Sequence, residues 1–238
     1  MATMVHMELA PLPPNGFLTV NKPLPHAQHI FGTRDDTPTA DAAIRRHTER
    51  LGPIAHMRQT HGPRIAYAET SGVLEDCDAL FTDHSELWLA VKTADCAPVL
   101  ISSPNAVAAV HAGWRGLENG ILPATIDTLC TAFDLLPEDL HVALGPCVHA
   151  ANYEVDGTFV ARFGERFVRP AGTGSCTLDI PALVRHQAIS SGVLDIHFHD
   201  IGRCTYASPE TFHSHRRNTH QGVPTAGRQL SFIRRLVE

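Results

Sequence analysis

The sequence lacks any segment with the character of a membrane span or a secretory leader. No basic stretch followed by an apolar run opens the chain, and no window of its 238 residues reaches ~18 uninterrupted apolar residues. We therefore expect a cytoplasmic protein with no membrane partner.

Positive charge is also scarce. Lys and Arg number 19 against 25 Asp and Glu, which gives a formal net charge of −6, and only two Arg-Arg pairs stand out. A protein that binds nucleic acid is expected to carry a basic face. Nucleic acid is therefore excluded as a principal partner.

Paired cysteine motifs are missing as well. The six cysteines are far apart and form no CxxC, which argues against a zinc ribbon and a thioredoxin-like site. A disulfide framework is unexpected in a chain of this length without a secretory signal. Histidine is in excess instead, with 16 residues against 3 Tyr and 2 Trp.

The composition is that of an ordinary globular protein. Hydrophobic residues make up 43% and charged residues 18%, which excludes a disordered chain and a long coiled coil. No low-complexity linker and no internal repeat divides the chain. We predict a single domain over residues 1–238, with residues 1–25 as a loosely ordered N-terminal extension.

Helical and strand patterns are mixed along the chain. Helices are predicted at 37–52, 119–133, 160–167 and 181–190, the first with Pro38 in its first turn and Gly52 at its end. Apolar runs of strand length occur at 64–68, 87–91, 97–101, 106–110, 141–144 and 194–199. Because the two kinds of element do not alternate regularly, we predict an α+β fold with mixed β-sheets.

A β-hairpin is predicted where the runs 97–101 and 106–110 flank a four-residue turn. If the turn is symmetric, Cys96 lies opposite His111, with their Cβ atoms roughly 5 Å apart. That distance suits two metal ligands, or a nucleophile and its base. A one-residue change in the turn would separate the pair.

His61 is a third candidate, because it precedes Gly62 on a predicted turn. Turns commonly present reactive side chains. Two His ligands and one Cys ligand would leave a tetrahedral zinc ion one open position, as in catalytic zinc sites. From spacing alone, an inert buried cysteine beside two hydrogen-bonded histidines is an equal alternative.

Several segments resemble a known family. The most specific are residues 93–100, TADCAPVL, and 110–116, VHAGWRG, together with 59–62 and 78–82. Further matches follow in family order at 144–147, 153–155, 204–206, 214–217 and 227–228. On these motifs the chain resembles the YfiH/laccase-domain family of purine nucleoside phosphorylases, also called the polyphenol oxidoreductase or peptidoglycan-editing-factor family.

The resemblance implies packed mixed β-sheets flanked by helices in a single domain, and a Zn²⁺ site made by His61, Cys96 and His111. It also implies a purine nucleoside enzyme that phosphorolyses adenosine, inosine and methylthioadenosine and deaminates adenosine. In deamination, zinc would supply hydroxide to attack the purine C6 atom. The small-molecule partners would be a nucleoside and phosphate.

The resemblance also suggests roles for individual residues. Cys96 and His111 would belong to the catalytic group. Arg34 matches the family's early arginine and is the candidate phosphate clamp, and Arg115 is a second substrate-binding candidate. Asp78 is a candidate acid or orienting group, and capping a turn is its structural alternative. The family's Gly-Gly-x-Ser stretch and Leu-Asn pair after the arginine are replaced here by a shorter segment, residues 35–39.

Other functions remain open from the sequence. Cys96 and His111 could instead form the nucleophile and base of an amidase that acts on peptidoglycan precursors. A non-catalytic module that binds nucleosides is a further alternative. The sequence does not predict an oligomeric state.

A copper-dependent polyphenol oxidase is also considered, because copper oxidases use His-x-His pairs. The pair His197 and His199 is more simply the polar face of a half-buried strand. The pair His213 and His215 lies in a polar loop beside two arginines. Copper is therefore the less favoured cofactor.

Overall fold

The structure is a computed structural model that describes residues 17–18, 24–34, 39–172, 174–224 and 227–237. Most of the expected N-terminal extension, residues 1–25, lies outside this part of the chain. The expected beginning of the first helix at Thr37-Pro38 and most of the shortened segment after Arg34 also lie outside it.

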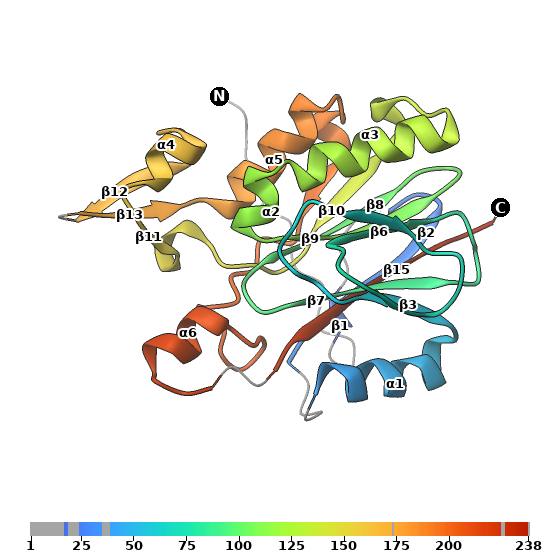
Figure 1. Ribbon diagram of the computed structural model, residues 1–238, viewed down its shortest axis with the longest axis horizontal. Coiled ribbons are helices and arrows are strands. Elements are labelled where there is room, and N and C mark those ends of the chain that lie inside the picture. The colour runs from blue at the N-terminus through green and yellow to red at the C-terminus, as the bar shows by residue number, and fades with distance from the viewer. Residues whose placement is uncertain (1–16, 19–23, 35–38, 173, 225–226, 238) are drawn as a thin grey trace.

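Two six-stranded mixed β-sheets form the centre of the molecule (Figure 1). The first has the order β1 (Phe17–Leu18), β2 (Ala27–Gly32), β15 (Gln229–Arg235), β7 (Trp88–Thr93), β3 (Ile54–Met57) and β5 (Gly72–Leu74). The second has the order β14 (Phe198–Asp200), β10 (His141–Leu144), β8 (Ala97–Ser102), β9 (Val107–Ala112), β6 (Ala79–Thr82) and β4 (Ile65–Tyr67). Both sheets combine parallel and antiparallel pairs, which confirms the predicted α+β class.

The two sheets pack face to face between two layers of helices. Phe31 and Leu89 of the first sheet share one buried cluster with Leu100 and Ala109 of the second. Helices α3 (Ile121–Phe133) and α5 (Ile180–Ser190) cover the outer face of the second sheet, and α1 (Ala40–Leu51) covers that of the first (Figure 1). The central strands are therefore buried on both faces, which explains their continuous apolar runs.

Smaller elements lie at one end of the two sheets. A three-stranded sheet has the order β11 (Glu154–Asp156), β13 (Ser175–Leu178) and β12 (Val168–Gly172), with α4 (Phe159–Phe163) beside it. Helix α2 (Trp114–Glu118) follows β9, and α6 (His215–His220) lies at the same end as this sheet (Figure 1). Three 3-10 turns occur at Pro137–Asp139, Ala150–Asn152 and Asp195–His197.

Helix α5 agrees with its predicted range, and α1 agrees with the predicted end of its range. Helix α1 begins after Thr39, whose hydroxyl accepts a hydrogen bond from the Ala42 amide at 3.2 Å, and it ends at Gly52. Helix α5 begins at Ile180, one residue before the predicted beginning. No helix in the described part of the chain has the length and apolar character needed to span a bilayer.

Two predicted helices are shorter than expected. The helix expected over 119–133 begins only at Ile121, because Asn119 caps the end of α2 and Gly120 adopts a left-handed φ of 74°. The helix expected over 160–167 is the five-residue α4, because Gly164, with φ 79°, ends it before Phe167.

The strand predicted over 194–199 is wrong for most of its length. Residues 195–197 form a 3-10 turn closed by the His197 amide donating to the Leu194 carbonyl at 2.9 Å, and only Phe198–Asp200 is a strand. The alternation that suggested a half-buried strand does not bury its apolar members, since Ile196 is 70% exposed.

The predicted hairpin exists, but its register differs from the expected one. His111 lies opposite Pro98 rather than Cys96, and the turn comprises residues 103–106. Ser103 causes the shift, because its amide and hydroxyl both donate to the Ala106 carbonyl and draw Ala106 into the turn. A shift of two residues keeps each side chain on its predicted face, so Cys96 and His111 become diagonal neighbours.

Candidate functional site

His61, Cys96 and His111 come together where the two large sheets end, and we call these three residues the trio. Their ligand atoms, the ring nitrogens and the sulfur, all lie within 4.8 Å of one another, so the trio can hold a metal ion. His111 is the fifth residue of β9, and Cys96 directly precedes β8. His61 lies in the loop after β3 with a left-handed φ of 62°, and its ring centroid is 4.7 Å from that of His111.

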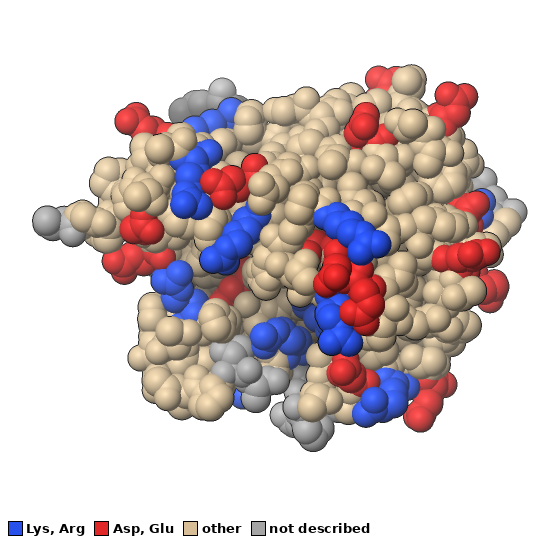
Figure 2. All heavy atoms as spheres, viewed as in Figure 1, with Lys and Arg blue, Asp and Glu red and all other residues tan. Residues whose placement is uncertain are grey.

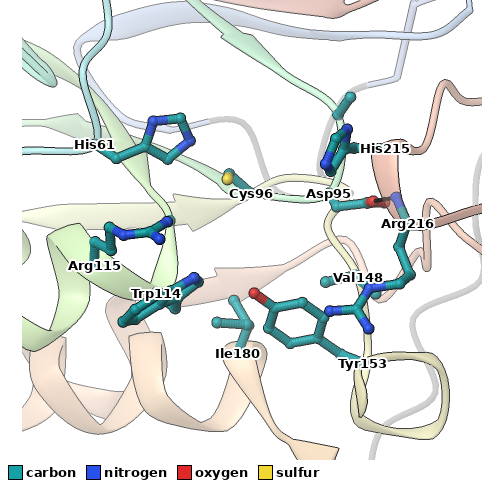
Figure 3. Close-up of a pocket in the computed structure, with 12 residues that line it drawn as sticks. His61, Asp95, Cys96, Trp114, Arg115, Val148, Tyr153, Ile180, His215 and Arg216 are labelled. Carbon is teal, nitrogen blue, oxygen red and sulfur yellow. Dashed lines mark hydrogen bonds between the residues drawn. The ribbon is translucent and has the colours of Figure 1, made fainter. Parts of the chain in front are cut away.

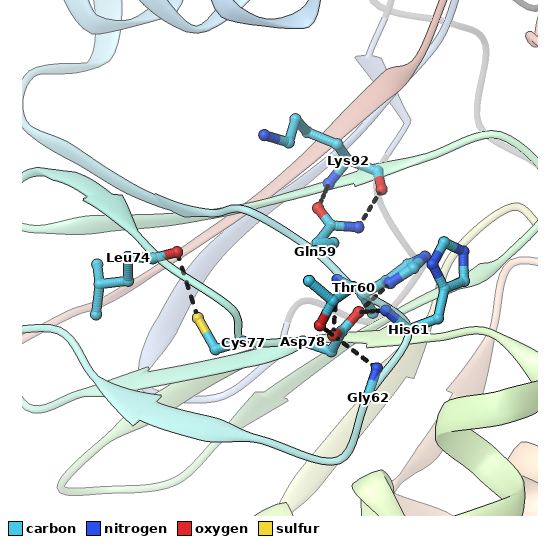
Figure 4. A network of polar contacts seen from close by, with 9 residues as sticks. Gln59, Thr60, His61, Gly62, Leu74, Cys77, Asp78 and Lys92 are labelled. Atoms are coloured by element: carbon cyan, nitrogen blue, oxygen red, sulfur yellow. Dashed lines mark hydrogen bonds and ion pairs between the residues drawn. The ribbon is translucent and has the colours of Figure 1, made fainter.

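Asp78 holds two members of the trio in place (Figure 4). Its Oδ1 atom lies 2.7 Å from Nδ1 of His111 and accepts a hydrogen bond from the His61 amide at 2.9 Å. Its Oδ2 atom accepts from the amides of Thr60 and Gly62 and from the Thr60 hydroxyl. The carboxylate is fully buried. It therefore fixes the His61 loop and leaves the other ring nitrogen of His111, Nε2, for a metal ion.

The protonation of the site follows from its burial and charges. Burial alone would raise the pKa of Cys96, but the neighbouring His111 and His61 rings lower it below its ordinary value. Burial opposes protonation of His111, yet Cys96 and Asp78 raise its pKa. The two residues thus form a thiolate and imidazolium pair in the absence of a metal ion. The pKa of Asp78 is lowered to about 2, because the hydrogen bonds from His111 and the loop amides outweigh its burial.

Gly113 leaves the space that the trio needs. A Cβ atom at this position would lie 3.0 Å from Sγ of Cys96 and 3.1 Å from Cδ2 of His61. Both contacts are tighter than ordinary van der Waals contact. Any side chain at position 113 would therefore push apart two of the three candidate ligands.

The trio opens into a cavity of about 380 Å³ that we call the aromatic cavity (Figure 3). Trp114 and Tyr153 face each other across it, and the Tyr153 hydroxyl points into the space between them. Arg115 and Arg216 lie against these rings, with guanidinium carbons 4.2 Å from the Trp114 centroid and 5.1 Å from the Tyr153 centroid. Burial raises the pKa of Tyr153, so its hydroxyl keeps its proton and can donate.

A second cavity of about 360 Å³, the basic cavity, adjoins the first and shares His61 and Cys96 with it. Arg58, Lys92 and Arg228 supply its positive charge. Figure 2 shows Lys and Arg side chains around the hollow between the α6 region and the body of the molecule. The site is therefore electropositive although the whole chain carries a net charge of −6.

Asp95 ties the segment before α6 to the site. Its Oδ1 atom accepts a hydrogen bond from the Thr205 hydroxyl at 2.6 Å. Its Oδ2 atom accepts from the Ser214 hydroxyl at 3.0 Å and from the Arg216 amide at 2.7 Å. Asp95 has φ 90°, a backbone conformation that residues other than glycine rarely adopt, and it directly precedes Cys96.

The two predicted substrate-binding arginines have different positions. Arg115 lines the aromatic cavity. Arg34 is exposed, donates from Nη1 to the Pro209 carbonyl at 3.0 Å and lines neither cavity. The structure therefore brings Arg115 to the trio and leaves Arg34 outside the cavity walls.

Among the site residues that were not predicted from the sequence are Asp95, Tyr153, His215 and Arg216. Each lies in or beside a segment that matches the family, but no spacing rule connects positions 95, 153 and 216. The prediction that His213 and His215 lie in a loop is confirmed for His213, which is half-buried before α6, and wrong for His215, an exposed residue that begins α6. His215 nevertheless lines both cavities.

His197 lies in the 3-10 turn before the edge strand β14, and His199 lies in β14, two strands from β8 in the sheet order. Their rings stack with His141 of β10, at centroid distances of 3.8 Å and 6.3 Å. Among the described residues, the trio is the one His, Cys or carboxylate group whose ligand atoms converge closely enough for a metal ion.

Comparison with known proteins connects this site with a family. Residues 24–236 match the family model described as multi-copper polyphenol oxidoreductase laccase. A purine nucleoside phosphorylase of Pseudomonas aeruginosa is 37% identical over 195 residues, which is 79% of each chain. A purine nucleoside phosphorylase of Xylella fastidiosa is 33% identical over 209 residues, 80% of this chain and 79% of that one.

A solved structure shares the fold. The crystal structure of YlmD from Geobacillus stearothermophilus has a TM-score of 0.86 and 26% identity, and the match covers 95% of this chain and 98% of that one. The whole described architecture, including both large sheets, is thus similar to that of a known protein.

Proposed function

The chain belongs to the family described as multi-copper polyphenol oxidoreductase laccase, and on that premise we propose that it is a purine nucleoside phosphorylase with a zinc ion held by His61, Cys96 and His111. The observation that carries the proposal is the convergence of these three ligand atoms within 4.8 Å at the mouth of two cavities. Relatives named purine nucleoside phosphorylase support the reaction.

The donor set fits zinc. One thiolate and two imidazoles leave a fourth position open, which is the arrangement of catalytic rather than structural zinc. The hydrogen bond from His111 to Asp78 is the outer contact that metal-bound histidines usually make. No methionine is found among the described residues that line the two cavities, so the long axial ligand of electron-transfer copper is not supplied there. Copper remains the less favoured ion for the same three ligands.

A zinc ion held by the trio would supply Lewis acidity, which would make a water molecule nucleophilic near neutral pH. Cys96 and His111, placed in the catalytic group by the resemblance, act here as its ligands. We assign Asp78 the role of a positioning residue rather than of an acid, because its carboxylate accepts five contacts and its pKa lies near 2.

Phosphorolysis transfers the ribose from the purine to phosphate. A phosphate oxygen forms a bond to C1′, the bond between C1′ and N9 breaks, and its electrons go to the purine, which takes up a proton. Such a reaction needs a cation near the phosphate and donors near the departing base. We assign Arg115 to the first need and the Tyr153 hydroxyl to the second, because both line the aromatic cavity. A contact between Arg34 and substrate rests on the resemblance alone.

We include adenosine, inosine and methylthioadenosine as substrates of phosphorolysis, and deamination of adenosine as a second reaction of the same site. In deamination, the oxygen of water forms a bond to C6, the bond between C6 and the amino group breaks, and ammonia leaves. This is the reaction for which nucleophilic water is required. A cytoplasmic location is part of the proposal, and the six free thiols support it because the cytosol keeps thiols reduced.

A cysteine hydrolase is the second candidate, because Cys96 has a lowered pKa beside His111. Such a pair is a nucleophile and its base. The two candidates differ in metal content. Inactivation by alkylation of Cys96 in a metal-free, active protein would favour the hydrolase, whereas a stoichiometric zinc ion required for turnover favours the phosphorylase.

The proposal is tested by incubating the purified protein with inosine or adenosine, with and without phosphate, and separating the products by chromatography. Hypoxanthine should appear from inosine only when phosphate is present. Inosine should appear from adenosine in either condition. Both activities should be lost in His61→Ala, and product formation no greater than in that variant would contradict the proposal.

A further inference from the structure

The aromatic cavity contains two guanidinium groups, and the proposed reaction so far uses only that of Arg115. Resting on that proposed function, we propose that Arg115 and Arg216 together hold the phosphate co-substrate beside the trio. Arg216 comes from α6 and Arg115 from α2, so the subsite joins two elements that are about a hundred positions apart in sequence.

The donors of the two arginines have no partner in the described part of the chain. Neither guanidinium group donates a hydrogen bond to, or forms an ion pair with, any residue that the structure describes. Arg217, next in the chain, shows the contrast: it is 8% exposed and donates to the carbonyls of Thr205, Tyr206 and Phe212. Arg217 therefore stabilises the segment before α6, whereas the donors of Arg216 remain available at the cavity.

A similar contrast exists at Trp114. Arg162 also lies over this ring, at 5.2 Å, but its Nη1 pairs with Glu118 at 3.3 Å. Arg115 lies closer to the ring, at 4.2 Å, without a carboxylate partner in the described chain. Of the two arginines that lie over Trp114, Arg115 lines the aromatic cavity and Arg162 does not.

Both guanidinium groups are held in position without using their donors. Contact with the faces of Trp114 and Tyr153 fixes their planes. Asp95 fixes the Arg216 backbone through the amide hydrogen bond of 2.7 Å. Its other contacts are with the hydroxyls of Thr205 and Ser214 rather than with the guanidinium. Planar, preoriented donors of this kind match the oxygens of phosphate.

The basic cavity is the alternative position for the phosphate, but its cations contact other groups or extend away from His61. Arg58 pairs with Glu75 at 2.6 Å. Arg228 donates from Nη1 to the Gly227 carbonyl at 2.8 Å. The Lys92 ammonium extends away from His61, while the Lys92 backbone is held by the Gln59 amide (Figure 4). The aromatic cavity therefore has the two cations best disposed to bind an anion next to Cys96.

Steady-state kinetics of inosine phosphorolysis tests the inference. Arg216→Gln and Arg115→Gln should each raise the KM for phosphate by roughly 10- to 100-fold, the loss expected for a charge-assisted hydrogen bond. The KM for inosine should change much less. Arg216→Lys keeps the charge without the planar fork and should restore part of the phosphate affinity. Arg166→Gln is the matched control, since Arg166 is also stacked on an aromatic ring but lines neither cavity.

Three kinetic results would overturn the subsite. The first is a phosphate KM within twofold of the wild type in both glutamine variants. The second is a large rise in Arg34→Gln with none in Arg216→Gln, which would assign the phosphate to Arg34. The third is an equal loss of affinity for phosphate and inosine, which would indicate a general structural defect.

Calorimetry separates failure of the subsite from failure of the proposed function. Inorganic phosphate and a nucleoside 5′-monophosphate are titrated separately into wild type and Arg216→Gln. Binding of inorganic phosphate that Arg216→Gln abolishes supports the subsite even if the wild type turns over no nucleoside, a result that would reject the phosphorylase alone. Arg216-dependent binding of the monophosphate only, or equal phosphate binding by both proteins, would overturn the inference.

Discussion

Asp78 is the residue on which the geometry of the trio depends, because it contacts both histidines and the loop between β3 and β4. Asp78→Asn removes the charge and one acceptor that hold His111. We expect zinc affinity to fall 10- to 100-fold, the usual effect of losing such an outer contact. Competition with a zinc chelator measures it.

Asp83→Asn is the matched control for Asp78→Asn. Asp83 follows β6, as Asp78 precedes it, and accepts a hydrogen bond from the Tyr67 hydroxyl at the surface. This variant should keep the zinc affinity of the wild type. Equal zinc affinity in Asp78→Asn and Asp83→Asn would show that Asp78 does not position the ligands.

Gly113 provides a steric test of the same site. Gly113→Ala places a methyl group about 3 Å from Sγ of Cys96 and from His61. Its φ of −76° suits alanine, so the backbone is not strained. We expect weaker zinc binding with little change in the midpoint of thermal unfolding. Gly157→Ala, where a Cβ meets nothing within 4 Å, should change neither quantity; zinc binding unaltered in Gly113→Ala would contradict the assigned geometry.

The carboxylate of Asp95 holds the segment before α6 in place. Asp95→Ala would leave the Thr205 and Ser214 hydroxyls and the Arg216 amide without their acceptor. Lost hydrogen bonds to a buried charge predict a decrease of about 1–3 kcal/mol in the free energy of unfolding. Hydrogen exchange should become faster over residues 205–220. Asp156→Ala, which removes an acceptor from an exposed turn, should leave exchange in that range unchanged.

Strands β2, β10 and β14 bring a group of histidines together away from the site, and this group predicts acid sensitivity. Burial lowers the pKa of His29 to about 4, with the charge of His199 adding to the effect. Burial also lowers the pKa of His141 to about 4, aided by His197, His199 and His26. The unfolded chain therefore takes up these protons near pH 6.5, before the folded chain does.

The stability contribution of these histidines is present above pH 6.5 and is lost as the pH falls from 6.5 toward 4. For His29 alone, the linkage relation gives a decrease of about 2 kcal/mol between pH 7 and 4.5. Urea unfolding at the two pH values should show this decrease reduced in His29→Phe. An identical pH dependence in wild type and His29→Phe would contradict the assignment, and His84→Gln, at an exposed histidine, serves as the control.

Sequence patterns were sufficient for the elements with strong local signals. The apolar runs predicted β4, β7, β8, β9 and β10 but missed β2, β3, β6 and β15, and Gly52 correctly marked the end of α1. The juxtaposition of Cys96 and His111 was predicted although the register was wrong, because the error of two residues preserved the face of each side chain. The predicted strand is wrong over residues 194–197. Alternation of apolar and polar residues does not show whether the apolar side chains are buried, and in this segment they are exposed.

The cavity walls were beyond sequence reasoning. Asp95, Tyr153 and Arg216 meet only after the two large sheets, β11 and α6 have packed at the same end. Their contacts are long-range hydrogen bonds and ring contacts, which have no periodic signal in the chain. The same packing places Arg34 outside the cavities, where its donor meets the Pro209 carbonyl.

The whole molecule is interpreted as a scaffold that holds one zinc ion at the end of two packed sheets, for phosphorolysis of purine nucleosides. The most direct test removes the metal with a chelator and titrates zinc back while inosine phosphorolysis is measured. We predict that turnover is lost and then returns in proportion to zinc, reaching its maximum at about one ion per chain. Full turnover by the metal-free protein, or none in the protein with zinc bound, would contradict the account.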